Sequence, residues 1–360
     1  MSQRKLRVGI IGCGKIAINH AAALQRIPEV ELVACTDVDG ERAAAFAADH
    51  GIARSYGDVG KMLTSGLDAV TVCTPHPVHE AGVLAAARHG LHVLCEKPIA
   101  ITLEETDRMI DACRDAEVKF GVLFQRRFWP AAQRIRQALD DGTLGTPIIG
   151  TCAVRLGRDA DYYAEPWRGR WDTEGGGVMI NQGIHYLDLL QWFMGDCVSV
   201  SARIATLKHG DHMETEDACV AILEFASGGL ATLTASVTFA PGLGNQVLIS
   251  DTFGQTASLT EMPEGTCVGN DIWTVGGCEE YLLPYSVGID NDPSLATIHQ
   301  GLVPFHREQI QEFIQAVLDD REPAVSGTDA RKSLAVIIAI SESARTGRPV
   351  AVSQLPAVIS

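Results

Sequence analysis

Small residues near the N-terminus have the spacing of a phosphate-binding turn. Gly12, Gly14 and Ala17 follow a short apolar run and precede a helical pattern that begins near Ile16. In such a unit the first glycine permits a tight turn, the second lets backbone amides approach a pyrophosphate, and the small third residue allows close helix packing. The helix N-terminus then favours the phosphate charge. The pattern predicts a dinucleotide site that includes Gly12, Gly14, Lys15 and Ile16.

An acidic residue ends the second apolar run. Asp37 lies about 25 residues after Gly12, where a carboxylate can hydrogen-bond the adenine ribose hydroxyls and repel a 2′-phosphate. This placement favours NAD over NADP, although the nearby Arg42 leaves NADP possible. The alternative is an ordinary glycine turn in which Asp37 only caps the next helix. The preceding apolar strand, the spacing of the small residues and the position of Asp37 together favour the cofactor site.

A second polar set lies on an otherwise apolar helical pattern. Asn181, His185 and Asp188 are at positions i, i+4 and i+7, so a helix would place them along one face. A neutral imidazole whose pKa is near the working pH can act as a general base. The alternative is a structural histidine at a domain interface, with Asp188 as its partner.

Short β-branched runs alternate with alanine-rich helical stretches from Leu6 to Phe124. Repeated units of this kind predict a buried parallel sheet. One helix has Thr102 as its N-cap and Glu105 in the capping-box position. The expected fold of residues 1–125 is a Rossmann-like, doubly wound α/β domain with helices over Glu41–His50, Val78–His89 and Leu103–Ala116.

The pattern changes after Pro147, where strand-like segments follow one another and residues 227–229 form a hairpin signal. The length of 360 residues also favours two domains. We therefore expect residues 126–360 to form an α+β domain with a large, mainly antiparallel open sheet. Its later elements are predicted as helices over Phe305–Asp319 and Asp329–Thr346 and a strand over Val350–Val352.

Composition excludes several classes of function. The formal charge of −16 opposes binding to nucleic acid or to an anionic membrane. No apolar run reaches the roughly 20 residues that cross a bilayer, and no signal peptide follows Met1, so we expect a cytoplasmic protein. The ten cysteines have neither CxxC nor Cys/His metal spacing. They are interpreted as reduced core thiols, and no metal is expected.

Four further segments carry a resemblance that covers nearly the whole chain. They are VTVCTPHPVHEAG, HVLCEKPIA, GGGVMINQGIHYLDLLQWFMG and SESARTGRPV. In this order they resemble the Gfo/Idh/MocA family of oxidoreductases. The resemblance implies that Lys97, in the Glu-Lys-Pro motif, reaches the reacting carbon and the nicotinamide, and that its bond to Pro98 is often cis. It also implies catalytic places for His185 and Asn181. The family often has aspartate at the latter place, and an amide there weakens any two-carboxylate proton relay.

The resemblance implies NAD(P)-dependent hydride transfer to or from a hydroxyl or keto carbon of a sugar, polyol, sugar acid or nucleotide sugar. His185 would be the base, and Lys97 would stabilise charge on the alcohol oxygen. The alternative for Lys97 is an ordinary surface charge. Further cofactor contacts are expected from Thr74, Pro75, His76, His79 and Glu96. His79 could equally lie on a helix surface.

Arginine and aromatic residues are concentrated between positions 155 and 171 of this acidic chain. Aromatic faces pack on sugar rings, and arginine forks bind hydroxyls, carboxylates or phosphates. The tryptophans could instead fill an interface. From this segment the expected substrate contacts are Arg155, Tyr163, Trp167 and Arg168. Arg126 is added because it follows the sixth strand, and the resemblance implies Asn181, His185 and His306.

Two alternatives remain open from the sequence. The chain could be a non-catalytic dinucleotide sensor, although Lys97 and His185 together argue against that. It could also keep its cofactor bound between turnovers, or begin an elimination by transient oxidation. The resemblance implies a homodimer or homotetramer that assembles through the C-terminal sheet.

Overall fold

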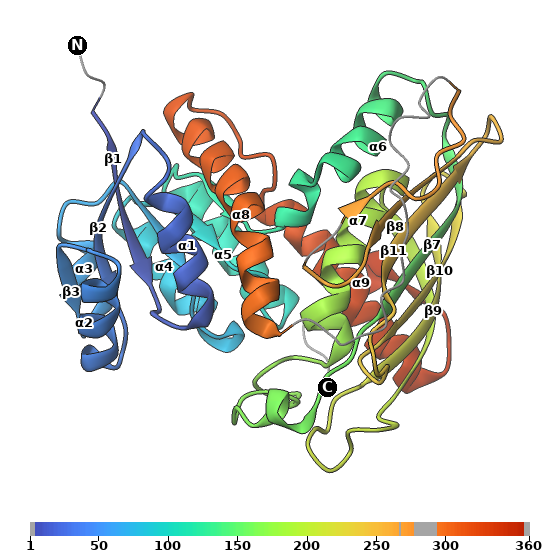
Figure 1. The fold of residues 1–360 in the computed structure, drawn as a ribbon, viewed down its shortest axis with the longest axis horizontal. Helices are drawn as coiled ribbons and strands as arrows, with labels where there is room; N and C mark the ends of the chain where they lie inside the picture. Colours follow the sequence, from blue (N-terminus) through green and yellow to red (C-terminus); the bar gives the residue numbers. More distant parts are fainter. Residues whose placement is uncertain (1–3, 266–267, 277–293, 356–360) are drawn as a thin grey trace. The chain divides into compact units, whose positions relative to one another are not determined.

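A computed structural model describes residues 4–265, 268–276 and 294–355. The chain divides into two compact units (Figure 1). The first comprises Met1–Gln125 with His299–Arg331, and the second comprises Arg126–Ile298 with Lys332–Ser360. Each unit is described by itself below.

The first unit is built on a six-stranded parallel sheet with the order β3-β2-β1-β4-β5-β6. This is the doubly wound order that binds dinucleotides at the carboxyl ends of the strands. The predicted Rossmann-like domain is therefore confirmed. The strands are β1 (Leu6–Ile11), β2 (Val30–Thr36), β3 (Arg54–Tyr56), β4 (Ala69–Val72), β5 (His92–Cys95) and β6 (Phe120–Val122).

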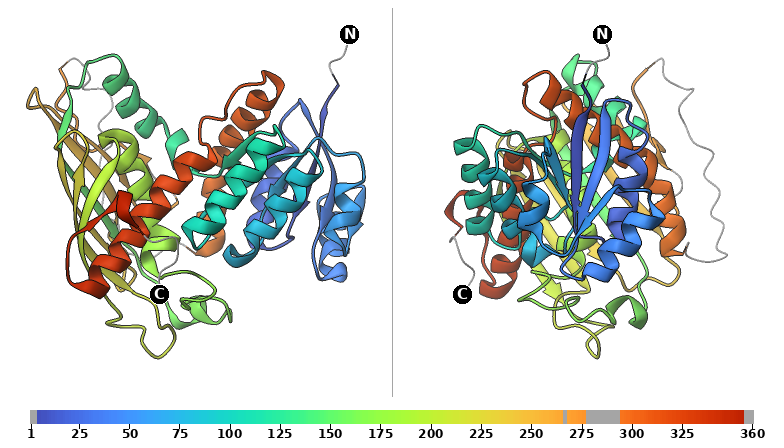
Figure 2. Two further views of the ribbon diagram at one scale, coloured as in Figure 1. Left: turned by 180° about the vertical axis from the view of Figure 1, so that it is seen from behind. Right: turned by 90° about the vertical axis from the view of Figure 1, so that its left-hand side faces the viewer.

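Helices cover both faces of this sheet (Figure 2). The capping box of Thr102 and Glu105 is present at the start of α5. Sequence analysis missed the short β3 and α3, which have too few residues to show a period. The helices are α1 (Lys15–Leu24), α2 (Gly40–Asp49), α3 (Val59–Leu63), α4 (His79–Arg88), α5 (Leu103–Asp115) and α8 (Leu295–Leu318).

Helix α8 returns to the first unit after the chain has built most of the second. Ile310, Phe313 and Ile314 of α8 belong to the same buried core as Val8 and Ile10 of β1. The prediction of two consecutive domains contains no such return. The prediction also began this helix at Phe305, directly after Pro304. The helix instead continues through Pro304.

The second unit contains an eight-stranded sheet with the order β13-β12-β11-β7-β10-β9-β8-β14. Every pair is antiparallel except β7 with β10, so the expected mainly antiparallel sheet is confirmed. The predicted hairpin joins β9 to β10, with Gly228 at φ +85°. The strands are β7 (Pro147–Arg155), β8 (Cys197–Ala205), β9 (Ala218–Phe225), β10 (Leu230–Ser236), β11 (Gly244–Asp251), β12 (Thr256–Glu261), β13 (Val268–Gly269) and β14 (Val350–Ala351).

One face of this sheet is covered by helix, and burial alternates along its strands. Helix α7 (Ile184–Met194) packs against β7 and β11. In β9 the residues that face the helices, Ala221 and Leu223, are buried, whereas Val220 and Ile222 are exposed. This alternation is typical of a sheet with one core face and one open face. The remaining helices of this unit are α6 (Pro130–Asp140) and most of α9 (Gly327–Thr346).

The cysteine interpretation is confirmed where the structure can test it. Eight cysteines in the described residues are free and buried. Cys267 and Cys278 lie outside the described residues. Among the described helices, none combines the length and apolar character needed to cross a membrane.

Candidate active site

The glycine turn has the geometry that a pyrophosphate requires. Gly12 has φ +89°, and a Cβ there would lie 2.9 Å from the backbone nitrogen of Thr74. Gly14 is the N-cap of α1, where no side chain caps the helix, and a Cβ on it would meet nothing within 4 Å. Open space therefore lies beside Gly14 at this helix end. Lys15 is exposed and Ile16 is half-buried beside it.

Asp37 is held rigidly at the end of β2. Its Oδ2 accepts from the Cys13 N–H at 2.9 Å, and its Oδ1 accepts from the Asp39 N–H at 3.0 Å. The Arg42 guanidinium lies 3.6 Å from Oδ1. The N-cap of α2 is Asp39, not Asp37. The alternative that Asp37 only caps this helix is therefore wrong.

An apolar residue that the sequence analysis did not select lies next to Asp37. The side chain of Val38 is 99% exposed. A fully exposed valine immediately after a β-strand offers an apolar surface beside the carboxylate. Its position directly after the acidic residue was the available sequence signal.

His79 joins the loops that follow β4 and β5. Its Nδ1 lies 2.9 Å from the Pro98 carbonyl oxygen, and its Nε2 lies 2.8 Å from the Thr74 carbonyl oxygen. Burial lowers the pKa of His79, so the neutral ring donates to one of the two carbonyls. The ring is fully buried, which rules out the helix-surface alternative and gives it a bracing role. His76 is 8% exposed, Thr74 is half-buried and Pro75 is exposed.

The Glu-Lys-Pro motif directs its glutamate inward. The Lys97–Pro98 bond is cis, as the resemblance implied. Lys97 is half-buried, and its backbone N–H donates to Glu96 Oε2 at 3.1 Å. Glu96, which was expected to contact the cofactor, is buried beneath this backbone. The buried glutamate thus holds the backbone of the lysine that follows it.

Two histidines face the Glu96 carboxylate from different helices of the first unit. His20 Nε2 of α1 lies 3.0 Å from Glu96 Oε1, and His306 Nε2 of α8 lies 3.7 Å from it. Burial raises the pKa of Glu96, but the contacts with His20 and His306 outweigh it and hold the pKa below its ordinary value. Burial lowers the pKa of His20. The carboxylate is therefore the charged member, and His20 donates to it as a neutral ring.

His306 therefore has a different place from the one expected. It is fully buried, in the middle of α8, and its Nδ1 lies 2.9 Å from the Leu302 carbonyl oxygen. Sequence reasoning placed it at a helix start facing substrate. Local periodicity could not indicate its approach to Glu96, which depends on the return of α8 to the first unit.

Ligand-type atoms of His20, Glu96 and His306 all lie within 4.8 Å of one another. A metal-bound imidazole usually donates its other nitrogen to an acceptor. His20 Nδ1 has no hydrogen-bond partner among the described residues. The 3.0 Å separation from Glu96 is that of a hydrogen bond. The structure thus describes this cluster as a hydrogen-bonded group in which His20 donates to the carboxylate.

In the second unit, a glycine run lets the chain pass close to Glu216. A Cβ on Gly177 would lie 1.9 Å from the Glu216 carbonyl oxygen. The Glu216 side chain accepts from the Gly177 and Met179 N–H groups at 2.9 and 3.0 Å. Burial outweighs these bonds and raises its pKa to about 7. The helix then begins as a π-helix, Met179–Gly183, which the assumed single α-helical period did not predict.

Asn181 has a carboxylate partner that the sequence analysis missed. Its Nδ2 donates to Glu174 Oε1 at 2.6 Å and to the Tyr162 hydroxyl at 3.1 Å. Glu174 is 2% exposed, and the Arg168 guanidinium lies 3.5 Å from Oε1. A negative charge therefore lies next to the amide, supplied from another position of the chain.

His185 lies in the first turn of α7 and is 5% exposed. Asp188, the alternative partner for it, is used elsewhere. Two nitrogens of Arg127 each donate to the Asp188 carboxylate at 2.7 Å, and the Ser333 hydroxyl donates at 3.1 Å. Asp188 therefore serves a buried ion pair within the second unit.

The expected substrate residues fall into two groups. Tyr163 is half-buried beside Tyr162, and Arg168 lies over the Trp167 ring at 4.4 Å and donates to the Tyr162 hydroxyl at 2.7 Å. These residues thus approach Asn181. Arg155 is half-buried and donates to the Gly244 carbonyl oxygen at 3.3 Å.

Arg126 has a different environment from these residues. It is 4% exposed, lies over the Trp129 and Tyr186 rings at 5.2 and 4.9 Å, and is 3.8 Å from Glu261. A guanidinium enclosed in this way stabilises the interior of the second unit. The substrate role of Arg126 stays a prediction.

Comparisons with known proteins agree with this arrangement. Residues 6–124 match the oxidoreductase family with an NAD-binding Rossmann fold, and residues 132–256 match the GFO/IDH/MocA C-terminal domain. The chain is 30% identical to D-apiose dehydrogenase of Paraburkholderia graminis, over 98% of this chain and 92% of that relative. It is 27% identical to myo-inositol 2-dehydrogenase of Thermotoga maritima, over 97% and 99% of the two chains.

A similar solved structure is the WlbA dehydrogenase of Bordetella pertussis, crystallised with NADH and UDP-GlcNAcA. Its TM-score is 0.80 at 31% identity, with 98% of this chain and 99% of that chain covered. These relatives match the chain along nearly its full length. The match therefore includes the segments that form the strand order, the glycine turn and the Glu-Lys-Pro motif. The chain belongs to the Gfo/Idh/MocA family of NAD-binding oxidoreductases.

Proposed function

We propose that the protein transfers hydride between NAD and a hydroxyl or keto carbon of a sugar, polyol, sugar acid or nucleotide sugar. The observation that carries the proposal is the pairing of two motifs. In the NAD-binding unit, Lys97 follows the buried Glu96, which accepts from its backbone N–H. In the other unit, Asn181 and His185 lie in the helix that follows a run of glycines. The named relatives are dehydrogenases, so the sensor alternative is not retained.

The first unit offers a place for each part of the dinucleotide. The turn at Gly12 and Gly14 would hold the pyrophosphate, and Asp37 would accept hydrogen bonds from the adenine ribose. The exposed Val38 would cover one face of the adenine. NAD, when bound, supplies the carbon that accepts or returns the hydride.

The protein's own groups then manage the proton and the developing charge. The Lys97 ammonium would donate a hydrogen bond to the substrate oxygen and stabilise its negative charge. His185 would take the hydroxyl proton during oxidation and return it during reduction. Glu174 fixes which way the Asn181 amide faces, because it accepts from Nδ2 at 2.6 Å. Asn181 would thus orient the substrate hydroxyl without itself carrying charge.

The test measures NADH formation with a panel of aldoses, polyols and uronic acids. We expect Lys97→Ala and His185→Ala each to reduce turnover about 10²- to 10⁴-fold, the range for a lost general acid or base. His89→Ala, at an exposed helix end, is the matched control and should retain activity. Full turnover by either active-site variant would refute the assignment. Denaturing the purified protein and assaying released nucleotide distinguishes a retained cofactor from an exchanging one.

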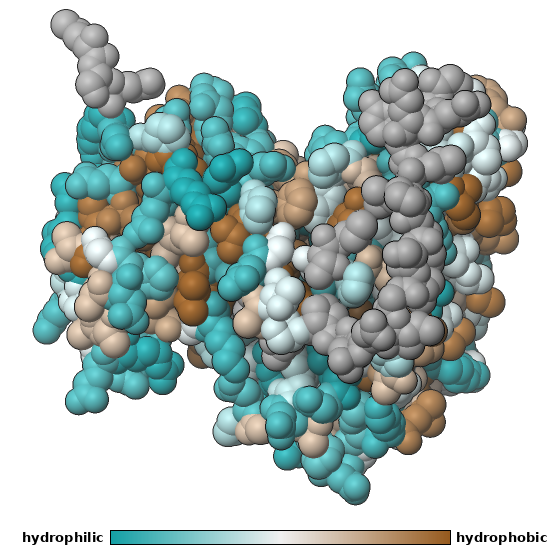
Figure 3. Space-filling model, viewed as in Figure 1, coloured by the Kyte–Doolittle hydropathy of each residue, from teal (hydrophilic) through white to brown (hydrophobic). Residues whose placement is uncertain are grey.

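We also propose that a second copy of the chain covers the open face of the C-terminal sheet. Val220, Ile222, Leu230 and Ile149 on this face are 48–58% exposed. Apolar surface gathers along the right-hand side of Figure 3, where β7, β9 and β10 lie in Figure 1. Light scattering should show a dimer or tetramer that Ile222→Lys dissociates. A cytoplasmic location is proposed from the buried free thiols.

A further inference from the structure

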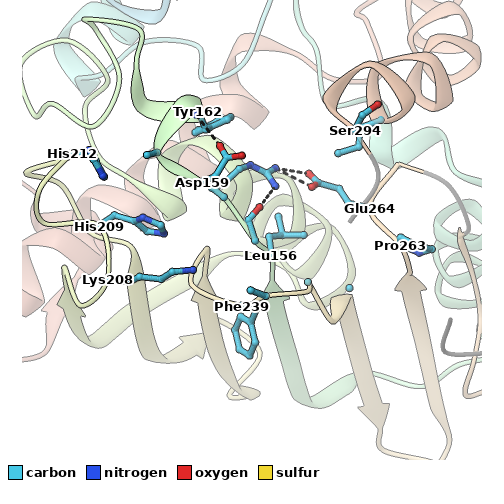
Figure 4. A pocket seen from close by; sticks show the side chains of 17 residues that line it. Leu156, Asp159, Tyr162, Lys208, His209, His212, Phe239, Pro263, Glu264 and Ser294 are labelled. Atoms are coloured by element: carbon cyan, nitrogen blue, oxygen red, sulfur yellow. Dashed lines mark hydrogen bonds and ion pairs between the residues drawn. The ribbon is translucent and has the colours of Figure 1, made fainter. Parts of the chain in front are cut away.

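A cavity of about 640 Å³ lies within the second unit, beyond the carboxyl ends of the parallel pair β7 and β10 (Figure 4). The segment after β7 lines it with Arg158 and Tyr162, and the loop after β8 lines it with Lys208, His209 and His212. Arg158 and Tyr162 belong to the arginine- and aromatic-rich segment 155–171, whereas the sequence analysis did not select the three loop residues. Its volume is in the range of small-molecule sites.

His209 is a buried hydrogen-bonding group without a protein partner on one nitrogen. Its side chain lines the cavity, the residue is 4% exposed, and its Nε2 has no hydrogen-bond partner among the described residues. The centre of the Tyr163 ring lies 5.4 Å from the centre of the His209 ring. The His209 backbone N–H donates to Asp217 at 2.9 Å, so the position of His209 is fixed. Buried polar atoms are nearly always satisfied. A ligand atom in the cavity would satisfy this one.

The charges of the lining favour a negative ligand group on the His209 side. Arg158 donates to both Glu264 oxygens at 3.0 and 2.9 Å, so that carboxylate is already neutralised. Lys208 and His212 lie on the same wall as His209 in Figure 4. Asp159, the other acid of the lining, accepts from the Tyr162 N–H at the start of a helical turn. The Arg158–Glu264 pair thus leaves Lys208 and Asp159 as the other charged side chains of the lining, and Lys208 is the one beside His209.

Tyr162 connects the cavity to the proposed catalytic amide. Its ring lines the cavity, and its hydroxyl accepts from Asn181 Nδ2 at 3.1 Å and from Gln182 Nε2 at 3.0 Å. The cavity and the proposed catalytic amide therefore share Tyr162.

We propose that this cavity binds an anionic group of the substrate, a carboxylate or a phosphate, through His209 Nε2 and the Lys208 ammonium. The inference rests on the proposed function and narrows it, because it makes an acidic or phosphorylated sugar the substrate in place of a neutral polyol. Imidazole and ammonium N–H groups form charge-assisted hydrogen bonds to both anions.

The experiment compares neutral and acidic partners of one sugar in the NADH assay. Glucose is paired with glucuronate and with glucose 6-phosphate, so that the two acidic arms distinguish a carboxylate from a phosphate. We expect kcat/KM to favour one acidic member. Lys208→Met and His209→Gln should each lower that value about 10- to 100-fold, the effect of a lost hydrogen bond to a charged group, and leave glucose unchanged. Lys332→Met, which removes an exposed lysine of the same unit, is the control.

A calorimetric arm measures binding of the same three sugars to the full chain with NADH present. Lys208-dependent binding of an acidic sugar supports the cavity assignment even if no sugar is oxidised, in which case only the proposed function fails. Equal binding by Lys208→Met and Lys332→Met, or no binding of either acidic sugar, overturns the inference. Lys97-dependent oxidation of neutral sugars alone would then leave the proposed function standing.

Discussion

Replacing Glu96 with glutamine removes one buried charge and leaves the side-chain shape almost unchanged. The carboxylate accepts from His20 Nε2 at 3.0 Å and from the Lys97 N–H at 3.1 Å, through different oxygens. A glutamine side chain has only one acceptor oxygen, so either His20 or the Lys97 N–H would face its NH₂ group instead. The lost charge-assisted bond costs about 1.5–3 kcal/mol and the unsatisfied donor about 1–3 kcal/mol. We therefore expect Glu96→Gln to lower the unfolding free energy by about 3–5 kcal/mol.

Thermal unfolding of the full chain, followed by circular dichroism, measures this loss. At roughly 2–4 °C per kcal/mol for a unit of this size, the first transition should fall by about 6–20 °C. Glu322→Gln is the matched control, because that side chain is 78% exposed and 3.6 Å from Lys119 Nζ. Its effect should stay within about 0.5 kcal/mol. If the amide oxygen stays with His20, its NH₂ group faces the Lys97 N–H, and the Glu96→Gln enzyme should then also lose turnover at temperatures where it remains folded.

One result would refute this reasoning directly. If Glu96→Gln unfolds at the wild-type temperature and retains wild-type turnover, Glu96 is not an ionised anchor for Lys97. A stability loss with unchanged turnover would separate the two claims: Glu96 would then support the fold without positioning the lysine.

Three further perturbations have defined outcomes. Burial lowers the pKa of His20 and His79 below the ordinary 6.5, so at these two rings the unfolded chain binds more protons than the folded chain. The raised pKa of Glu216 acts in the opposite direction, and with two rings against one carboxyl the urea midpoint should fall as the pH drops from 7.5 to 5.5. Asp37→Ser should lower kcat/KM for NAD at least about tenfold and raise it for NADP; an unchanged preference contradicts the ribose assignment. Gly177→Ala should lower the unfolding free energy by several kcal/mol, measured by thermal melting, and should reduce turnover, because the new Cβ would lie 1.9 Å from a carbonyl oxygen. Gly276→Ala is the control: its Cβ meets nothing within 4 Å, so stability and turnover should not change.

Residues whose signal is local could be predicted from the sequence. The turn at Gly12 depends on spacing within one strand–turn–helix unit, and the capping box at Thr102 depends on four consecutive residues. The alternating burial of β9 follows from the two-residue period of a strand. Each of these features is determined by neighbours along the chain, which is why the fold class and the NAD-binding turn could be inferred.

Contacts between distant segments could not be predicted in this way. His306 meets Glu96 only because α8 returns to the first unit, and no local pattern marks that return. Glu174 meets Asn181 across a glycine-rich loop whose path is not periodic. His209 becomes a candidate ligand only when a cavity forms beside it. Each of these side chains appeared unremarkable, or was given another role, until its spatial neighbours were known.

The two motifs that carry Lys97 and His185 are supported in the same physical way. In each unit a buried glutamate accepts the backbone N–H groups of the motif that presents the reactive side chain: Glu96 accepts from Lys97, and Glu216 accepts from Gly177 and Met179. A buried acceptor holds those N–H groups in one orientation, because leaving them unpaired inside the protein would cost free energy. The backbone that carries Lys97 or leads into the His185 helix is thereby held in place. Substitutions at these two glutamates should therefore resemble losses of catalytic residues, although neither carboxylate would touch the substrate.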